Sequence, residues 1–271
     1  MTILEGSLVC FLDERDFEDS MIVGGYYIQK KNLQKLDNYI LEIKQKFNLA
    51  DSDPIKWNLK DKACINARKL IQANKVDDLR RHVFSIIVKI PLRIIMSHVW
   101  KGKPENLEEA WKWAFIDILQ RLSIDLERKS KELNSQDFYP FLDVVFDWFP
   151  GRGKLEDYFG VYQTAYLNGY KFSENELLPL KRFKACPCLL VTSARYSQAL
   201  QLTDFFIGVT SDFFKWCYND IRKQNVDHYF SQMFKAFLKC DDGKVLGCGL
   251  ITKKDSRCKI RRKLKELKLE G

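Results

Sequence analysis

Three aspartates stand where the neighbouring sequence is apolar: Asp13, Asp147 and Asp204. Asp13 follows the apolar run 8–12, and Asp147 follows the apolar run 144–146. Asp204 lies within a stretch of Leu, Phe, Ile and Val. A carboxylate in such surroundings is costly unless it is protonated, paired with a cation or bound to a metal.

Asp often begins a turn, so a turn alone explains either strand-end aspartate taken singly. Taken together, three carboxylates repel one another where the dielectric constant is low, and divalent cations relieve that repulsion. Ligands that are all oxygen atoms favour Mg²⁺ or Mn²⁺ over Zn²⁺. Two such ions, about 3.5–4 Å apart, can stabilise the attacking and leaving oxygens of a phosphodiester. The residues therefore predict a two-metal site in which Asp13, Asp147 and Asp204 hold the cations.

The helix expected at 197–218 surrounds Asp204 with apolar residues. Five small or polar residues share one narrow sector of this helix at 100° per residue: Ser197, Gln201, Asp204, Gly208 and Ser211. We interpret this sector as a polar seam that faces a site, with Gly208 permitting close approach of another segment. A modest solvent-exposed stripe is the alternative.

The elements that must position these residues follow from hydrophobic periodicity and turn signals. Strands are expected at 7–12, 21–28, 84–90, 93–99, 141–146 and 186–191. Helices are expected at 32–48, 61–73, from 104 onward, 154–167, 197–218, 227–239 and at the C-terminus. This order predicts an α/β fold, a mixed sheet flanked by helices. We expect one domain over 1–220, with a helical insertion at about 30–82, and a C-terminal extension over 221–271 that ends in a basic helix.

Composition excludes several classes of protein. The chain has 271 residues, of which 46% are hydrophobic and 30% are charged, so wholesale disorder and a disulfide-stapled miniature fold are excluded. No apolar run is long enough for a membrane span, and the first residues do not resemble a secretory signal. Cysteines within apolar runs, and a spacing of Cys240, Cys248 and Cys258 that suits zinc poorly, favour reduced thiols and a cytoplasmic location.

The formal net charge of +9 is unevenly distributed. Residues 252–271 contain nine Lys or Arg and three Asp or Glu, so two thirds of the excess lies in this segment. A basic helix of this kind suits contacts with the phosphates of DNA or RNA, whereas a solvated, mobile terminal helix is the plainer explanation. Nucleic acid is thus the expected partner, membrane is not, and a partner protein or a second copy of the chain remains open.

Several short blocks resemble the domain of unknown function 3800 family, which is largely prokaryotic and associated with mobile elements. The blocks are Phe11-Leu12-Asp13-Glu14, Val23-Gly24-Gly25, Ile55-Lys56-Trp57, Val145-Phe146-Asp147, Ser193 and the run 200–208 that begins Leu-Gln-Leu-Thr-Asp. The resemblance implies a ribonuclease-H-like fold with Asp13, Asp147 and Asp204 as the metal-binding acids. It also implies that Lys56 is a polar residue of the site, and that Ser193 and Gln201 line it.

A fourth metal ligand is left open by the sequence. Members of the family often carry an acid just before the lysine, where this chain offers Asp53 or Asp51. Related sites also draw an acid from the helix after the central hairpin, and the candidates there are Glu108, Glu109 and Asp117. Of these, Asp53 is the ligand that we add to the three aspartates.

The segment after Asp147 reads Pro-Gly-Arg-Gly-Lys, so Arg152 and Lys154 are candidate phosphate-binding residues, with a plain turn as the alternative. The function expected overall is that of a Mg²⁺- or Mn²⁺-dependent nuclease, in which Lys56 stabilises the charge developing on the phosphate. One alternative is a non-catalytic module of a defence or mobile-element system that binds nucleic acid or a partner. Another is a metal-dependent hydrolase acting on a small phosphorylated substrate.

Overall fold

The computed structural model describes residues 7–17, 20–100, 107–132, 141–148, 155–171, 177–252 and 254–270. The strands are β1 (Leu8–Phe17), β2 (Ser20–Gln29), β3 (Leu92–Trp100), β4 (Leu142–Asp147), β5 (Leu190–Thr192) and β6 (Leu250–Thr252). The helices are α1 (Leu33–Lys46), α2 (Lys69–Gln72), α3 (Val76–Phe84), α4 (Ile86–Lys89), α5 (Leu107–Glu132), α6 (Leu155–Leu167), α7 (Gln198–Asn219), α8 (Val226–Phe234) and α9 (Lys254–Glu266).

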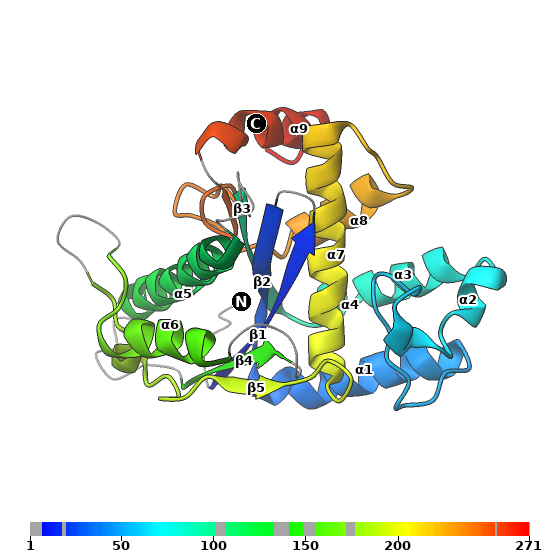
Figure 1. Cartoon of the computed structure of the whole chain (residues 1–271), viewed down its shortest axis with the longest axis horizontal. Coiled ribbons are helices and arrows are strands. Elements are labelled where there is room, and N and C mark those ends of the chain that lie inside the picture. The colour runs from blue at the N-terminus through cyan, green and yellow to red at the C-terminus, as the bar shows by residue number, and fades with distance from the viewer. Residues whose placement is uncertain are drawn as a thin grey trace.

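These strands form one mixed sheet in the order β5-β4-β1-β2-β3-β6. The three strands β1, β2 and β3 form an antiparallel meander. Strand β4 lies parallel to β1, β5 lies parallel to β4, and β6 lies parallel to β3. Figure 1 shows α5 and α6 on one side of this sheet, with α7 on the other and α1 to α4 beyond it. The predicted α/β fold, a mixed sheet flanked by helices, is confirmed.

Both faces of the sheet are covered, which explains why its central strands are apolar runs without strict alternation. On β1, Val9 and Phe11 belong to the core that α7 covers. Leu8, Cys10 and Leu12 belong to the core that α5 and α6 cover. Asp13 continues the first series, because alternate residues of a strand point to the same face. The side chain of Asp13 is therefore directed toward α7.

The helices α1 to α4 form an insertion between β2 and β3. The strand expected at 84–90 was wrong: this stretch contains the end of α3 and the short helix α4. Ile86 and Ile90 are buried, but Val88 is 88% exposed, so only part of the apolar run belongs to the core. Ile90 is extended, as the residue before Pro91 usually is, and α4 ends just before it. The insertion therefore extends further than the sequence indicated.

The segment after residue 220 packs against the same core. Strand β6 pairs with β3 at the edge of the sheet, and α8 packs beside α7. Helix α9 lies across the C-terminal end of α7, at the top of Figure 1. It buries Ile260 and Leu264, and the Lys263 ammonium lies 4.5 Å from the centre of the Trp216 ring. The basic helix is thus docked on the body of the protein. Within the described residues, no helix has the length and apolar character needed to cross a membrane.

Candidate functional site

Asp13 and Asp147 lie side by side on neighbouring strands. In the parallel pair formed by β1 and β4, Leu12 is opposite Phe146, so the next residue on each strand is one of the two aspartates. Neighbouring strands are about 4.8 Å apart, and both aspartates occupy the series that faces α7. Each is only 5% exposed. Two carboxylates far apart in sequence are therefore held together by strand register.

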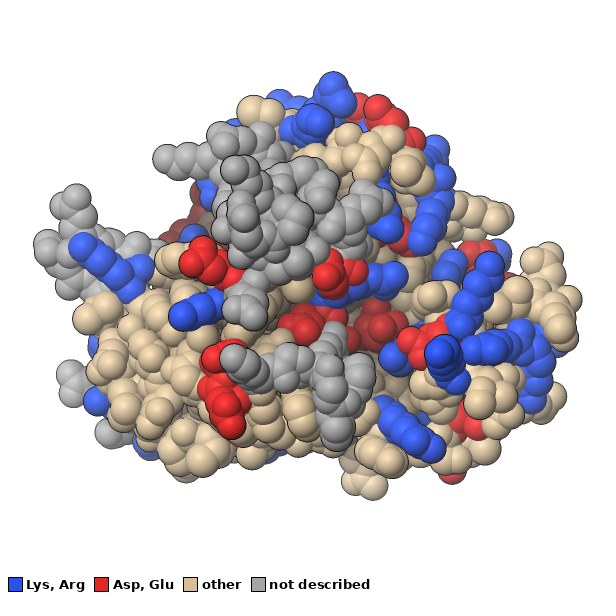
Figure 2. Space-filling model, viewed as in Figure 1, with Lys and Arg blue, Asp and Glu red and all other residues tan. Residues whose placement is uncertain are grey.

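Asp204 approaches the same place from helix α7, whose first turn is capped by Ser197. One pocket of about 660 Å³ is lined by all three aspartates. Its other lining residues are Glu14, Pro54, Lys56, Asp61, Lys62, Ala63, Ser193, Ala194 and Arg195. Figure 2 shows acidic side chains gathered near the middle of this face, with Lys and Arg toward the insertion. The described lining residues include five acids and three bases, so their formal charge is −2.

The polar seam on α7 receives a short segment of the insertion, residues 55–57. The Ile55 amide donates to Gln201 Oε1 (3.2 Å), and the Trp57 amide donates to Asp204 Oδ2 (2.7 Å). Gln201 Nε2 also donates to the Ala194 carbonyl (2.9 Å). Gln201, expected to contact substrate, does not line the pocket: it is 1% exposed and ties the insertion to the loop after β5.

Trp57 anchors this segment by packing against Gly208. A Cβ atom added at Gly208 would lie 2.2 Å from Cγ of Trp57, so no larger residue fits there without moving the indole. The indole Nε1 donates to the buried Asp212 Oδ2 (2.7 Å). On the other side, the Arg80 guanidinium lies 3.7 Å from the ring centre and donates to the Trp57 carbonyl (2.8 Å). The close approach expected at Gly208 is thus made by Trp57.

This anchoring fixes Lys56, which lines the pocket and forms an ion pair with Asp61 (3.3 Å). Burial lowers the pKa of Lys56, but the charges of Asp204, Asp61 and Asp13 outweigh burial, so the net shift is upward. Lys56 therefore keeps its positive charge at neutral pH. Burial, and secondarily the charge of Asp13, raises the pKa of Asp204 against the opposing effect of Lys56. Asp204 thus favours a proton or a bound cation more than an ordinary aspartate does.

The expected fourth ligand, Asp53, does not line the pocket. Its carboxylate accepts from the Ala50 amide (2.8 Å) and from Asn66 Nδ2 (2.6 Å), so it stabilises a turn. Asp61 lies in the pocket instead, five residues after the lysine and at the start of a 3-10 turn that it caps. The short spacing between Lys56 and Asp61 is the sequence signal that could have identified this acid.

The other residues expected at the site divide into those that reach the pocket and those that do not. Ser193 lines it, and its Oγ accepts from the Arg195 amide (3.2 Å). Arg195, which sequence reasoning missed, lines it as well. Arg152 and Lys154 lie outside the described residues.

The alternative acids on α5 do not reach the pocket either. Asp117 accepts from Ser97 Oγ (2.9 Å) on the opposite face of the sheet, and Glu109 lines a separate pocket between α5 and α6. The side chain of Glu108 lies outside the described part of the chain.

The donor set suits Mg²⁺ or Mn²⁺ in chemistry, because every acidic ligand offered is a carboxylate oxygen. The positions of these carboxylates, however, do not form a complete coordination site. Among the residues that the structure describes, no three Asp, Glu, His or Cys side chains are grouped closely enough to hold one ion. Asp147 Oδ1 accepts from the Ala194 amide (2.8 Å), and Asp13 Oδ1 accepts from the Glu14 amide (2.6 Å).

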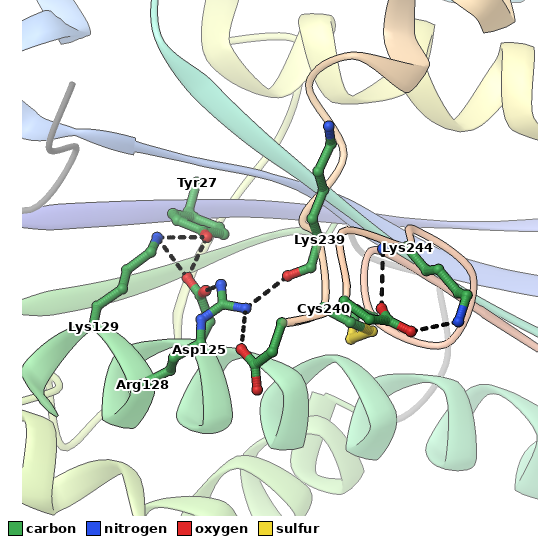
Figure 3. Close-up of polar contacts among 10 residues, drawn as sticks. Tyr27, Asp125, Arg128, Lys129, Lys239, Cys240 and Lys244 are labelled. Atoms are coloured by element: carbon green, nitrogen blue, oxygen red, sulfur yellow. Dashed lines mark hydrogen bonds and ion pairs between the residues drawn. A yellow bond between two sulfur atoms is a disulfide. The ribbon is translucent and has the colours of Figure 1, made fainter. Parts of the chain in front are cut away.

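The buried carboxylate of Asp125 has a different environment. Asp125 on α5 is 3% exposed and contacts Lys129 (2.7 Å), Arg128 (2.5 Å) and the Tyr27 hydroxyl (2.5 Å), as Figure 3 shows. Arg128 also donates to the carbonyl of Lys239 (2.8 Å), at the start of the loop that follows α8. This network is structural, because cations and a phenol compensate the buried charge.

The loop beside this network contains a disulfide between Cys240 and Cys248. The expectation that both residues are reduced thiols was therefore wrong. A separation of eight residues suits zinc poorly, but it does not prevent a loop from folding back on itself. The Cys240 amide donates to the Lys244 carbonyl (2.8 Å), which brings the two ends of this loop together.

The chain matches no family model, no curated protein and no solved structure.

Proposed function

We propose that this protein is a Mg²⁺- or Mn²⁺-dependent enzyme that cleaves phosphodiester bonds in nucleic acid, with a ribonuclease-H-like core. One observation carries the proposal: Asp13, Asp147 and Asp204, from two strands and a helix far apart in sequence, line one pocket together with Lys56. Membership of the domain of unknown function 3800 family is part of the same proposal, and it rests on the short blocks that resemble that family.

The sheet supports the proposed fold. A ribonuclease-H-like core is expected to have an antiparallel meander of three strands, followed by two further strands parallel to the first. Here β1, β2 and β3 form such a meander, and β4 and β5 continue the sheet from β1. The helices α5, α6 and α7 follow β3, β4 and β5 in turn. The insertion α1 to α4 and the edge strand β6 would be additions to that core.

The residues that would hold the cations are Asp13, Asp147 and Asp204, with Asp61 as the acid nearest to them from the insertion. When bound, divalent cations would neutralise phosphate charge and lower the pKa of attacking water. Asp204 is suited to this role because its raised pKa reflects a carboxylate short of compensating charge. The repulsion between Asp204 and Asp13 would be relieved by a shared cation.

The protein's own cations would orient the substrate. Lys56 is held beside the acids through Trp57, so its ammonium can contact a phosphate oxygen without a large loss of side-chain entropy. Charge that develops on the phosphate would be stabilised by the same ammonium. Arg195 is exposed at the rim, next to Ser193, where it can contact a neighbouring phosphate. The pocket opens on the surface, which allows a polymer to lie across it.

The test is cleavage of labelled single- and double-stranded DNA and RNA with Mn²⁺ or Mg²⁺. The wild-type protein is expected to cut at least one polymer. Asp204→Asn and Asp147→Asn are expected to lower the rate by at least about a hundredfold, as loss of a key electrostatic group commonly does. Asp143→Asn is the matched control: it removes the same charge from the same strand, but Asp143 pairs with Lys30 (2.6 Å) and does not line the pocket. Full metal-dependent cleavage by Asp204→Asn would refute the assignment.

A second candidate function is a non-catalytic module that binds nucleic acid or a partner protein. The spacing of the acids favours it, since no three described side chains are grouped for one ion. Calorimetric titration with Mn²⁺ separates the two candidates. Binding that is lost in Asp204→Asn supports the enzyme, whereas salt-sensitive binding of nucleic acid without any Mn²⁺ binding supports the module. Cleavage of nucleotides but not of polymers would instead indicate a hydrolase of small phosphorylated substrates.

A further inference from the structure

A second pocket, of about 740 Å³, lies at the opposite end of the sheet from the acids. The end of β2, the start of α1, the short helix α4 and the end of α8 surround it. It shares no lining residue with the acidic pocket. Along β2, Gln29 in its wall and Gly24 opposite Asp13 are five residues apart in register, or about 17 Å. The two pockets are therefore separate sites.

The apolar part of this pocket is mainly aliphatic. Its apolar lining residues are Phe84, Ile87, Val88, Pro91, Leu92 and Ala236. Phe84 and Leu92 are buried in the floor, whereas Val88 on α4 is the most exposed of the large apolar side chains in the described part of the chain. Phe84, the aromatic residue of the described lining, is only 1% exposed, so its ring offers almost no surface for stacking a nucleobase. The lining instead suits a flexible hydrocarbon body.

The charged residues of the lining are all basic. They are Lys31, Lys35, Lys89, Arg93 and Lys235, and no Asp or Glu is among the lining residues that the structure describes. None of these five forms an ion pair with a carboxylate in the part of the chain that the structure describes. Lys35 Nζ donates to the Lys89 carbonyl (3.2 Å), and Lys89 Nζ lies 4.2 Å from the centre of the Tyr39 ring. The four lysines thus surround the pocket without an ion-pair partner among the described residues. Arg93 differs from them: it is opposite Tyr27 in the sheet, and its charge acts on Tyr27 and Lys129 on the face that α5 covers.

We propose that this pocket binds a small organic anion, with its negatively charged head among the lysines and an aliphatic body against Val88 and Ile87. The volume lies within the range of about 300–1,000 Å³ that is typical of small-molecule sites. Charge complementarity selects an anion, because four lysines without an ion-pair partner among the described residues repel one another and a bound anion relieves that repulsion. The proposal does not depend on the chemistry of the acidic pocket.

Calorimetric titration of the full chain with four probes tests this ligand chemistry. Octyl phosphate and octanoate have both an anionic head and an aliphatic body, and both are expected to bind. Inorganic phosphate lacks the body and 1-octanol lacks the charge, so each is expected to bind at least about tenfold more weakly. The two anionic probes also distinguish a preference for phosphate from a preference for carboxylate.

Two variants test the location. Val88→Glu adds a negative charge at an exposed rim position and is expected to weaken binding of octyl phosphate by at least about tenfold. Lys35→Glu, on a different helix of the rim, is expected to do the same, which guards against a local effect on α4. Ile65→Glu is the matched control, because Ile65 is also exposed (72%) but lines neither pocket. Its affinity should be that of the wild type.

Several outcomes would overturn the proposal. Binding of 1-octanol as tight as that of octyl phosphate would show that charge plays no part. Unchanged affinity in both Val88→Glu and Lys35→Glu would place the ligand elsewhere, and no binding of either anionic probe would refute the site itself. If only an oligonucleotide binds, and Lys35→Glu abolishes that binding, the rim belongs to a nucleic-acid surface and the small-anion proposal fails.

Discussion

The contact between Gly208 and Trp57 gives the sharpest test of how the candidate site is built. In Gly208→Ala, the new Cβ would lie 2.2 Å from Trp57 Cγ, whereas ordinary contact begins near 3.4 Å. The indole would therefore have to withdraw by about 1.2 Å, the difference between these two distances. That movement would weaken the hydrogen bond from Trp57 Nε1 to Asp212 and would displace the adjacent Lys56.

The expected loss of stability follows from three contributions. Overpacking of a core costs roughly 1–3 kcal/mol, and loss of a hydrogen bond to a charged group costs roughly 1.5–3 kcal/mol. The better helix propensity of Ala offsets about 1 kcal/mol of this. The free energy of unfolding of Gly208→Ala should thus fall by roughly 1.5–5 kcal/mol, which lowers Tm by roughly 3–20 °C for a chain of this size.

Thermal unfolding followed by circular dichroism measures this change. Gly160→Ala is the matched control, because Gly160 lies in helix α6 and a Cβ added there would meet nothing within 4 Å. It should gain roughly 0.5–1 kcal/mol from helix propensity alone. If Gly208→Ala is stabilised like Gly160→Ala, Trp57 does not pack on α7 as described, and the positioning of Lys56 has no basis.

Three further predictions concern charge, pH and the disulfide. Asp204→Asn should raise the free energy of unfolding at neutral pH by about 0.5–2 kcal/mol while removing cleavage. Because the pKa of Asp204 is raised, the protonated aspartate stabilises the folded protein, and this stabilisation is lost as pH rises through that pKa. The difference in stability between the variant and the wild type should therefore shrink in acid. Burial lowers the pKa of His98 to about 3, so between pH 6.5 and that value only the unfolded chain gains a proton at this residue. The free energy of unfolding of the wild type at pH 5 should therefore be about 2 kcal/mol below its value at neutral pH. Denaturant titrations that show the same drop in His98→Gln would contradict this. Cys248→Ser removes the disulfide that closes a short loop and should lower the free energy of unfolding by about 2 kcal/mol. Thiol counting checks that Cys240 is then free, and an unchanged stability would mean that the disulfide does not form in solution.

Much of the candidate site follows from two periodicities. Alternation along a strand directs Asp13 toward one face of the sheet, and the 3.6-residue repeat places Gln201, Asp204 and Gly208 on one side of α7. These local rules identify which residues share a face, but they do not give the distances between the carboxylates. The separation of the acids depends on how α7 crosses the sheet, which is set by packing across the whole core. Hence the sequence predicted a shared pocket but not whether the carboxylates already hold an ion.

The expectations from sequence that were wrong or incomplete have specific physical causes. The run 84–90 is too short for its apolar residues to distinguish a helix from a strand, and Pro91 is compatible with either. Asp61 was overlooked because a residue that caps a turn appears from sequence to have a purely local role. The pairing of Cys240 with Cys248 depends on a loop closure that spacing alone does not determine.

A comparison of Asp125 with Asp204 shows why the compensation of a carboxylate's charge, rather than its burial, indicates function. Asp125 is contacted by Lys129, Arg128 and a phenol, so its charge is satisfied inside the fold and needs no ligand. Asp204 accepts one backbone amide hydrogen bond and lies near a second carboxylate, and its pKa rises. A buried carboxylate without enough neighbouring positive charge or hydrogen bonds lowers the free energy of unfolding. Selection for stability alone would therefore replace such a residue by an uncharged one. Its position beside Asp13, in a pocket with an anchored lysine, is therefore the main support for the proposed cation site.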